Sequence, residues 1–141
     1  MKLEAAQRII AEALGFARAR GFKPLAVAVL DQRGALQAFA AEDGTSLKRG
    51  EVARGKAYGC IAVGLGSRAI EARALKDPHF IASITHVVGG TLVPVAGGVL
   101  VRDAAGTLLG AVGISGDTSD NDEAAACAAI AAVGLTAETG R

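Results

Sequence analysis

Residues 89–123, GGTLVPVAGGVLVRDAAGTLLGAVGISGDTSDNDE, hold the densest set of structural signals in the chain. Two glycine pairs, Gly89–Gly90 and Gly97–Gly98, stand on either side of Pro94. Glycine adopts positive φ without a steric penalty and lets the backbone approach another group closely. We therefore expect a loop of defined shape, in which at least one of Gly97 and Gly98 has positive φ.

The residues after this loop predict a β-hairpin. Two apolar runs, 99–101 and 108–114, flank the segment Asp103–Gly106. An aspartate can bond its own backbone in such a turn, and a glycine can take its left-handed position. The same D-x-x-G pattern occurs at Asp31–Gly34, between apolar runs at 25–30 and 35–40. The chain is therefore predicted to contain two similar hairpins.

Apolar residues at helical spacing predict a first helix that begins near Leu3 and ends near Gly21. Further helices are expected at 47–64 and 67–75, and a helical segment at 76–88, where Pro78 stops the preceding helix and a new turn begins around His79. A last helix is expected at 120–135.

That last helix follows a capping-box pattern, formed either by Ser119 with Asp122 or by Asp120 with Glu123. Helices and hairpins in this order predict an α+β domain with four or five mostly antiparallel strands.

Composition narrows the class of protein. A chain of 141 residues with 51% hydrophobic and 21% charged residues predicts one globular domain over residues 1–141. Aromatic residues make up 4% and form no basic stripe with Lys or Arg, so we expect no nucleic-acid partner. No apolar run approaches the roughly 18 residues of a membrane span, and no apolar leader follows Met1, so a cytoplasmic protein without a membrane partner is expected. Cys60 and Cys127 lack a C-x-x-C neighbour and are interpreted as reduced, buried residues.

His79 and His86 are the only imidazoles. Seven residues of helix separate them by about 10 Å, which is too far for both to bind one ion. Either could ligate a haem iron singly, or serve as a hydrogen-bonded surface or capping residue. The acids of 117–123 lack the glycine and terminal glutamate of a calcium loop. Capping explains several of them, so no metal site is predicted.

Two other patterns leave their roles open. Ser115 lies where a nucleophile elbow would place its serine, but Asp117 stands where G-x-S-x-G requires glycine. A tight turn is therefore expected there. Arg54 and Lys56 are interpreted as the polar edge of the helix at 47–64. They can pair with carboxylates, including haem propionates, or form a solvated face.

Three motifs together resemble the GlcG/HbpS family, which also includes the C-terminal domain of PduO-type proteins. They are ARGKAY at 53–58, GGTLVPVAGGV at 89–99 and GAVGISGDTSDNDE at 110–123. The resemblance covers essentially the whole chain. It implies a profilin-like α+β fold, with a five-stranded, mostly antiparallel sheet flanked by helices, and a homo-oligomer.

The resemblance also implies candidate site residues. Some family members bind haem, a few are described as degrading it, and many accompany pathways for small organic acids. The motif positions carried over are Arg54, Lys56, Gly89, Gly90, Pro94, Gly97, Gly98, Ser115, Gly116, Asp122 and Glu123. In contrast to the secreted haem-binding members, we expect no export signal here, and the predicted first helix contains no histidine.

Two functional hypotheses follow. In the first, the protein binds haem or a related tetrapyrrole near the glycine-rich loop, with His79 as axial ligand and Arg54 or Lys56 toward the propionates. In the second, it is a small-molecule enzyme or accessory protein of organic-acid catabolism. Its pocket then lies between protomers, with Lys56 and Glu123 as acid-base groups.

Both hypotheses need an assembly of at least two copies. We expect one because the chain has more apolar surface than a small monomer readily hides. The acids at 117–123 of one copy could then face Arg54 or Arg73 of another.

Overall fold

The computed structural model describes residues 1–141 and contains five helices and five strands. The helices are α1 (Leu3–Ala19), α2 (Arg49–Val63), α3 (Ser67–Lys76), α4 (Pro78–Val87) and α5 (Ser119–Ala132), and the strands are β1 (Ala26–Asp31), β2 (Leu36–Ala41), β3 (Gly98–Arg102), β4 (Leu108–Ser115) and β5 (Thr136–Glu138). The five strands form one antiparallel sheet, which confirms the predicted α+β fold.

The strand order is β2-β1-β4-β3-β5, so β1, β4 and β3 are central while β2 and β5 form the edges. All six residues of β1 are buried. Both hairpins are present, because β1 pairs with β2 and β3 pairs with β4. The pairing of β1 with β4 joins the two hairpins into one sheet.

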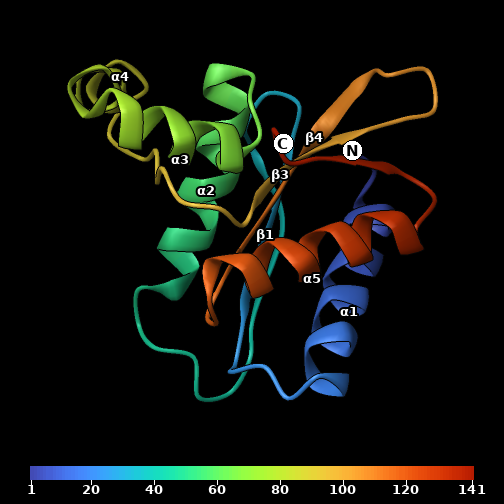
Figure 1. The fold of residues 1–141 in the computed structure, drawn as a ribbon. Helices are drawn as coiled ribbons and strands as arrows, with labels where there is room; N and C mark the ends of the chain where they lie inside the picture. Colours follow the sequence, from blue (N-terminus) through green and yellow to red (C-terminus); the bar gives the residue numbers. More distant parts are fainter.

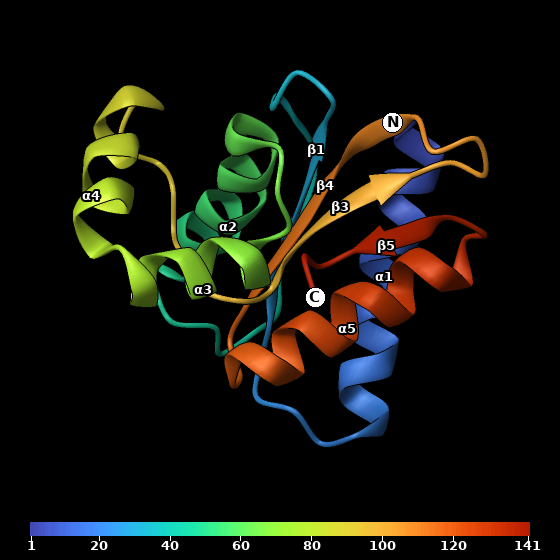
Figure 2. The same ribbon diagram turned by 45° about the horizontal axis from the view of Figure 1, so that its top comes forward.

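Helices cover both faces of the sheet (Figures 1 and 2). On one face, α1 and α5 pack on each other and on valine and isoleucine side chains of β1, β3 and β4. On the other face, α2 and α3 pack on Leu30, Leu100 and Ala111. Val99 and Val101 belong to the first layer and Leu100 to the second, which is the period-two alternation of a strand.

The two D-x-x-G turns have the predicted geometry. The Asp31 carboxylate accepts hydrogen bonds from the backbone N–H groups of Arg33 and Ala35, and Gly34 has φ of 82°. The Asp103 carboxylate accepts from Ala105 and Thr107 in the same way, and Gly106 has φ of 83°. A hydrogen bond from the Arg33 side chain also lowers the pKa of Asp31.

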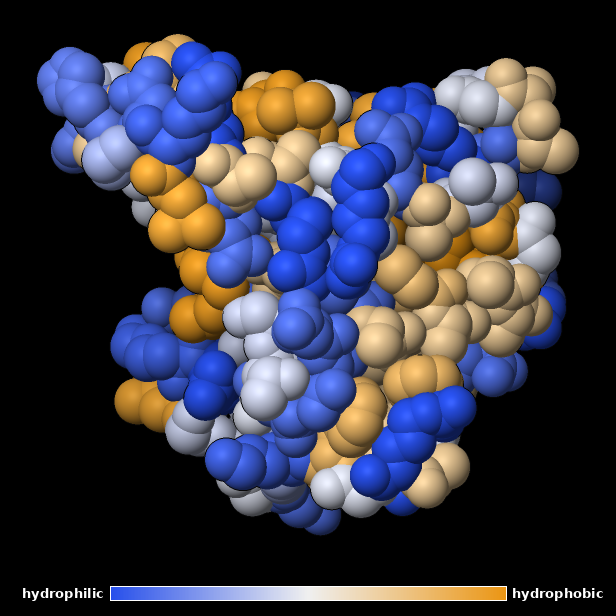
Figure 3. All heavy atoms as spheres, viewed as in Figure 1, coloured by the Kyte–Doolittle hydropathy of each residue, from blue (hydrophilic) through white to orange (hydrophobic).

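The start of α4 differs slightly from the prediction. Pro78 does end α3, but it is itself the first residue of α4, one position before His79. The Asp77 carboxylate caps the helix by accepting from the Phe80 N–H at 3.2 Å. Proline suits this position because the first helical N–H has no partner in the helix. Figure 3 shows α4 as a projecting lobe, with apolar atoms gathered at its base.

The predicted capping box of α5 is wrong. Thr118 is the N-cap, and its hydroxyl accepts from the Asn121 N–H at 3.2 Å. The helix ends at Ala132, and Gly134, with φ of 77°, allows the chain to turn into β5. Strand β5 has only three residues, too few to show the alternation of apolar and polar residues that predicts a strand. The residue patterns therefore did not predict its position.

The two cysteines are free. Cys60 is buried, which raises the pKa of its thiol to about 12, whereas Cys127 is only partly buried, against prediction. None of the five helices has the length and apolar character needed to cross a membrane.

Candidate functional site

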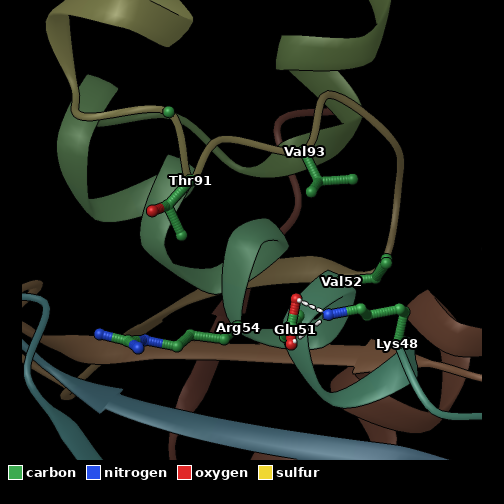
Figure 4. Close-up of a pocket in the computed structure, with 7 residues that line it drawn as sticks. Lys48, Glu51, Val52, Arg54, Thr91 and Val93 are labelled. Carbon is green, nitrogen blue, oxygen red and sulfur yellow. Dashed lines mark hydrogen bonds and ion pairs between the residues drawn. The ribbon is translucent and has the colours of Figure 1, made fainter.

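The largest hollow in the molecule, with a volume of about 620 Å³, lies between α2 and the glycine-rich loop. Lys48, Glu51, Val52, Arg54, Gly90, Thr91 and Val93 line it, and Figure 4 shows the loop residues facing the α2 residues. A second hollow of about 310 Å³ adjoins it and shares Glu51 and Arg54. We call the two together the α2 groove. Volumes of this order are typical of small-molecule sites.

Glycines on α2 create the close approach that shapes this groove. A Cβ at Gly55 would overlap the Thr91 carbonyl oxygen, and a Cβ at Gly59 would lie 3.0 Å from Leu92 Cγ. The Val93 N–H donates to the Gly55 carbonyl at 3.2 Å. Helix and loop therefore meet backbone to backbone, and only glycine allows that contact.

The second hollow adds an apolar wall to the groove. Leu36 and Phe39 of β2 line it together with Leu47 and Gly50. The Phe39 ring lies against Gly50, where an added Cβ would be 2.8 Å from the ring. The groove thus has apolar sides of the kind that most small-ligand sites use for affinity.

Arg54 is the charged residue of the groove that has no ion-pair partner. Lys48 Nζ pairs with Glu51 Oε1 at 2.9 Å, so those two charges offset each other. Arg54 forms no ion pair with any acid of the chain and extends away from that pair (Figure 4). The groove can therefore bind a ligand that carries a carboxylate.

Lys56 does not share the polar edge of α2 with Arg54, and that prediction is wrong. Residues two apart on a helix point about 200° apart, so Lys56 faces the core. Its side chain is 4% exposed, and Nζ donates to the Ile114 carbonyl at 2.9 Å and to Asp122 Oδ2 at 3.0 Å. Lys56 therefore joins α2 to β4 and α5 and does not reach the groove.

Glu123 is also committed to contacts inside the protein. Its side chain is 4% exposed and accepts hydrogen bonds from Arg68 at 3.1 Å and Arg141 at 2.7 Å. Asp122 is buried against Lys56, and Asp117 accepts from the Lys23 backbone N–H. These acids hold the fold together, so the predicted contact between the stretch 117–123 and a second copy's Arg54 or Arg73 is wrong for Asp122 and Glu123.

His79 and His86 both lie exposed on α4, and neither lines the α2 groove. Ser115 is fully buried as the last residue of β4, its hydroxyl accepts from Arg49 at 3.3 Å, and the chain bends only after it, at Gly116 and Asp117. No group of three or more His, Cys, Asp or Glu side chains in residues 1–141 is placed to hold a metal ion.

The glycine-rich loop has the predicted backbone. Gly89, Gly90 and Gly97 have φ of 92°, 87° and 115°. The value at Gly97 confirms the prediction that at least one of Gly97 and Gly98 has positive φ. Of the loop residues proposed for ligand binding, Gly90 lines the groove, whereas Gly89, Pro94, Gly97 and Gly98 do not. A Cβ at Gly98 would lie 2.6 Å from the Lys56 carbonyl, so Gly97 and Gly98 serve close packing under α2.

Sequence reasoning brought Arg54 and Gly90 to the site but missed most of its lining. The groove is completed by Leu36, Phe39, Leu47, Lys48, Gly50, Glu51, Val52, Thr91 and Val93. The spacing of Gly55 and Gly59, four residues apart on one helix face, was the available signal for a close backbone contact on α2.

Comparisons with known proteins agree with this architecture. A family model described as "Haem degrading protein HbpS-like" matches residues 1–131. The structure of a PduOC:heme complex superposes with a TM-score of 0.85 at 21% identity, covering 100% of this chain and 99% of that one. Klebsiella pneumoniae protein ORFY gives a TM-score of 0.84 at 21% identity, covering 95% and 90%. These two likenesses support the fold.

A double mutant of HbpS from Streptomyces reticuli is similar at 25% identity, with a TM-score of 0.79 and coverage of 94% of this chain and 86% of that one. No significant match was found among curated proteins. The family model spans nearly the whole fold and confirms the resemblance of the three sequence motifs. The chain therefore belongs to the family described as haem-degrading, HbpS-like proteins.

Proposed function

We propose that this protein binds haem or a related tetrapyrrole in the α2 groove. The observation that carries the proposal is the combination of an unpaired Arg54 with an apolar wall of Leu36, Phe39 and Leu47 in one hollow. A tetrapyrrole is flat and mostly apolar, and its propionates need cations. Family membership and the haem-bound PduOC structure of the same fold support this choice of ligand.

The residues fit the ring and the propionates better than they fit the iron. Apolar side chains would exclude water from the macrocycle, and the Arg54 guanidinium can donate two parallel hydrogen bonds to a propionate. Proteins hold haem iron with His, Cys, Met or Tyr, and none of these lines the groove. His79 can be the axial ligand only if a second protomer presents it there. Haem would supply the iron chemistry, and this chain's groove supplies orientation.

We expect purified protein to give a saturable Soret shift when haemin is added, and Arg54→Ala to weaken binding about tenfold. A hydrogen bond to a charged group is worth roughly 1.5–3 kcal/mol, and tenfold in affinity corresponds to about 1.4 kcal/mol. Arg8→Ala, an exposed arginine on α1, is the matched control and should bind as the wild type does. A spectrum indistinguishable from that of free haemin at stoichiometric protein would end the proposal.

Two further titrations distinguish binding of the tetrapyrrole ring from ligation of the iron. Iron-free protoporphyrin should bind with similar affinity, followed by its fluorescence, because the groove contacts the ring and propionates. His79→Ala tests the axial ligand directly. Loss of the Soret shift in that variant, with protoporphyrin binding intact, would support ligation by His79 from a neighbouring protomer.

A second candidate ligand is a small hydroxy or keto acid, since Arg54 would bind its carboxylate equally well. Lys56 and Glu123, proposed as its acid-base pair, are both buried and ion-paired away from the groove. We therefore propose binding in an accessory role for this class. If haemin fails, a thermal-shift screen of such acids is the test, because a ligand at a hundred times its Kd stabilises by about 2.7 kcal/mol.

A further inference from the structure

A third hollow, with a volume of about 200 Å³, lies apart from the α2 groove. It shares no lining residue with that groove and is lined by Lys23, Pro24, Gly44, Thr45, Ser46, Arg49 and Gly116. Two of these side chains are cationic, two carry hydroxyls and none is acidic. We call this hollow the polar pocket. A hollow lined by charges of one sign concentrates ligands of the opposite sign, so its lining suits a small anion.

Backbone contacts fix one wall of the polar pocket. The Lys23 N–H donates to the Asp117 carboxylate at 2.7 Å, which ties the segment before β1 to the segment after β4. A Cβ at Gly116 would overlap the Pro24 carbonyl oxygen, so only glycine allows these two segments to lie so close together. The pocket therefore has its shape before any ligand binds, which lowers the cost of ordering it.

Arg49, the first residue of α2, is oriented by the protein and keeps donors for a ligand. Its guanidinium donates to the buried Ser115 hydroxyl at 3.3 Å and forms no ion pair with any acid of the chain. A guanidinium has five N–H donors, and this contact uses one. The N-cap of α2, Lys48, supplies no side-chain cap, so the positive end of the helix dipole adds to the positive charge here.

The Lys23 ammonium is the second cation of the pocket, and it too has no ion-pair partner. The acids that lie near it in the chain do not neutralise the pocket. Glu42 pairs with Arg18 at 2.8 Å. Asp117 accepts from two backbone N–H groups and one side-chain amide. Asp43 is exposed and does not line the pocket. Both cations of the lining are therefore available to a ligand.

We propose that the polar pocket binds the phosphate group of a small phosphorylated molecule. Two cations without an acid in the lining match a dianion, and a phosphate monoester carries about −1.5 to −2 charges at pH 7. Arginine offers phosphate a planar pair of donors, and lysine offers a point charge. The volume of about 200 Å³ equals that of about seven water molecules, at about 30 Å³ each. That is room for a phosphate on a short carbon skeleton, and this site does not depend on haem binding in the α2 groove.

Calorimetric titration with inorganic phosphate, in a phosphate-free buffer at constant ionic strength, tests the proposal. We expect saturable binding by the wild type. Lys23→Gln and Arg49→Gln should each weaken it at least tenfold, because each removes a charged donor to the phosphate oxygens. Lys76→Gln is the matched control, since Lys76 is an exposed lysine of α3 that also lacks an ion-pair partner. It should bind phosphate as the wild type does.

Lys23→Gln keeps the test decisive even if Arg49→Gln is unstable. The contact of Lys23 with Asp117 uses the backbone N–H, so circular dichroism and melting of this variant should match the wild type. A wild type without saturable phosphate binding, or full binding by Lys23→Gln, overturns the proposal. Equal weakening by Lys76→Gln would mean attraction to overall charge, and tighter binding of succinate, a dicarboxylate of similar charge, would mean a carboxylate site. Either result also overturns it.

Discussion

Lys56→Met is expected to lower the free energy of unfolding by about 3–5 kcal/mol, the usual cost of leaving one member of a buried ion pair alone. Methionine matches the length of the apolar stem of lysine but removes the ammonium that Asp122 and the Ile114 carbonyl share. The Asp122 side chain is 1% exposed, so water cannot replace that ammonium. Because whole domains are stable by roughly 5–15 kcal/mol, this loss should be plain in urea denaturation.

Two variants show whether the charge itself is responsible. Arg54→Met changes an exposed cation on the same helix and should alter stability by less than about 0.5 kcal/mol. The double variant Lys56→Met with Asp122→Asn removes both charges and keeps an acceptor for the Asp117 N–H, so it should recover much of the loss. A Lys56→Met protein within about 1 kcal/mol of the wild type would contradict the importance of this pair.

The same pair predicts a pH dependence. Burial raises the pKa of Asp122, and the Lys56 ammonium opposes that rise. Without Lys56 the pKa rises further. A carboxyl whose pKa is raised on folding favours the folded state below its unfolded pKa of about 3.9 and loses that contribution as pH increases. The penalty of Lys56→Met should therefore be smallest near pH 4 and grow toward neutrality.

Gly113→Ala is expected to be the other severe change, on the order of 3 kcal/mol or more, because it inserts a methyl group between a strand and a helix backbone. Gly113 lies in β4 opposite Ala28 and Gly98. A Cβ there would overlap the Ala53 carbonyl oxygen and lie 2.9 Å from the Ala57 nitrogen. Helix α2 would have to move off the sheet, and urea denaturation should report the cost.

Gly15→Ala is the control for Gly113→Ala, because the same substitution is expected to raise the free energy of unfolding there. Gly15 lies inside α1, and apart from the neighbouring backbone of α1 no atom would lie within 4 Å of its Cβ. Alanine should stabilise the helix there by roughly 0.5–1 kcal/mol. Equal effects of the two substitutions would mean that α2 does not rest directly on β4.

The sequence by itself determined the features that depend on neighbouring residues. The D-x-x-G turns close through bonds that span two to four residues, so Asp31 and Asp103 identify both hairpins. Positive φ at Gly97 follows from the same local rule. Helix ends were less certain, since Thr118 and Ser119 are both good caps and only the surrounding fold selects one.

Only the tertiary structure decided which charged residues are buried and which serve the site. Lys56 reads as a surface lysine because its partner Asp122 is 66 positions away in sequence, and burial of an ion depends on finding such a partner. Arg54, two residues earlier, stays exposed and lines the groove. The position of β2 at the edge of the sheet is likewise a property of strand order, which long-range pairing sets and local residue patterns do not specify.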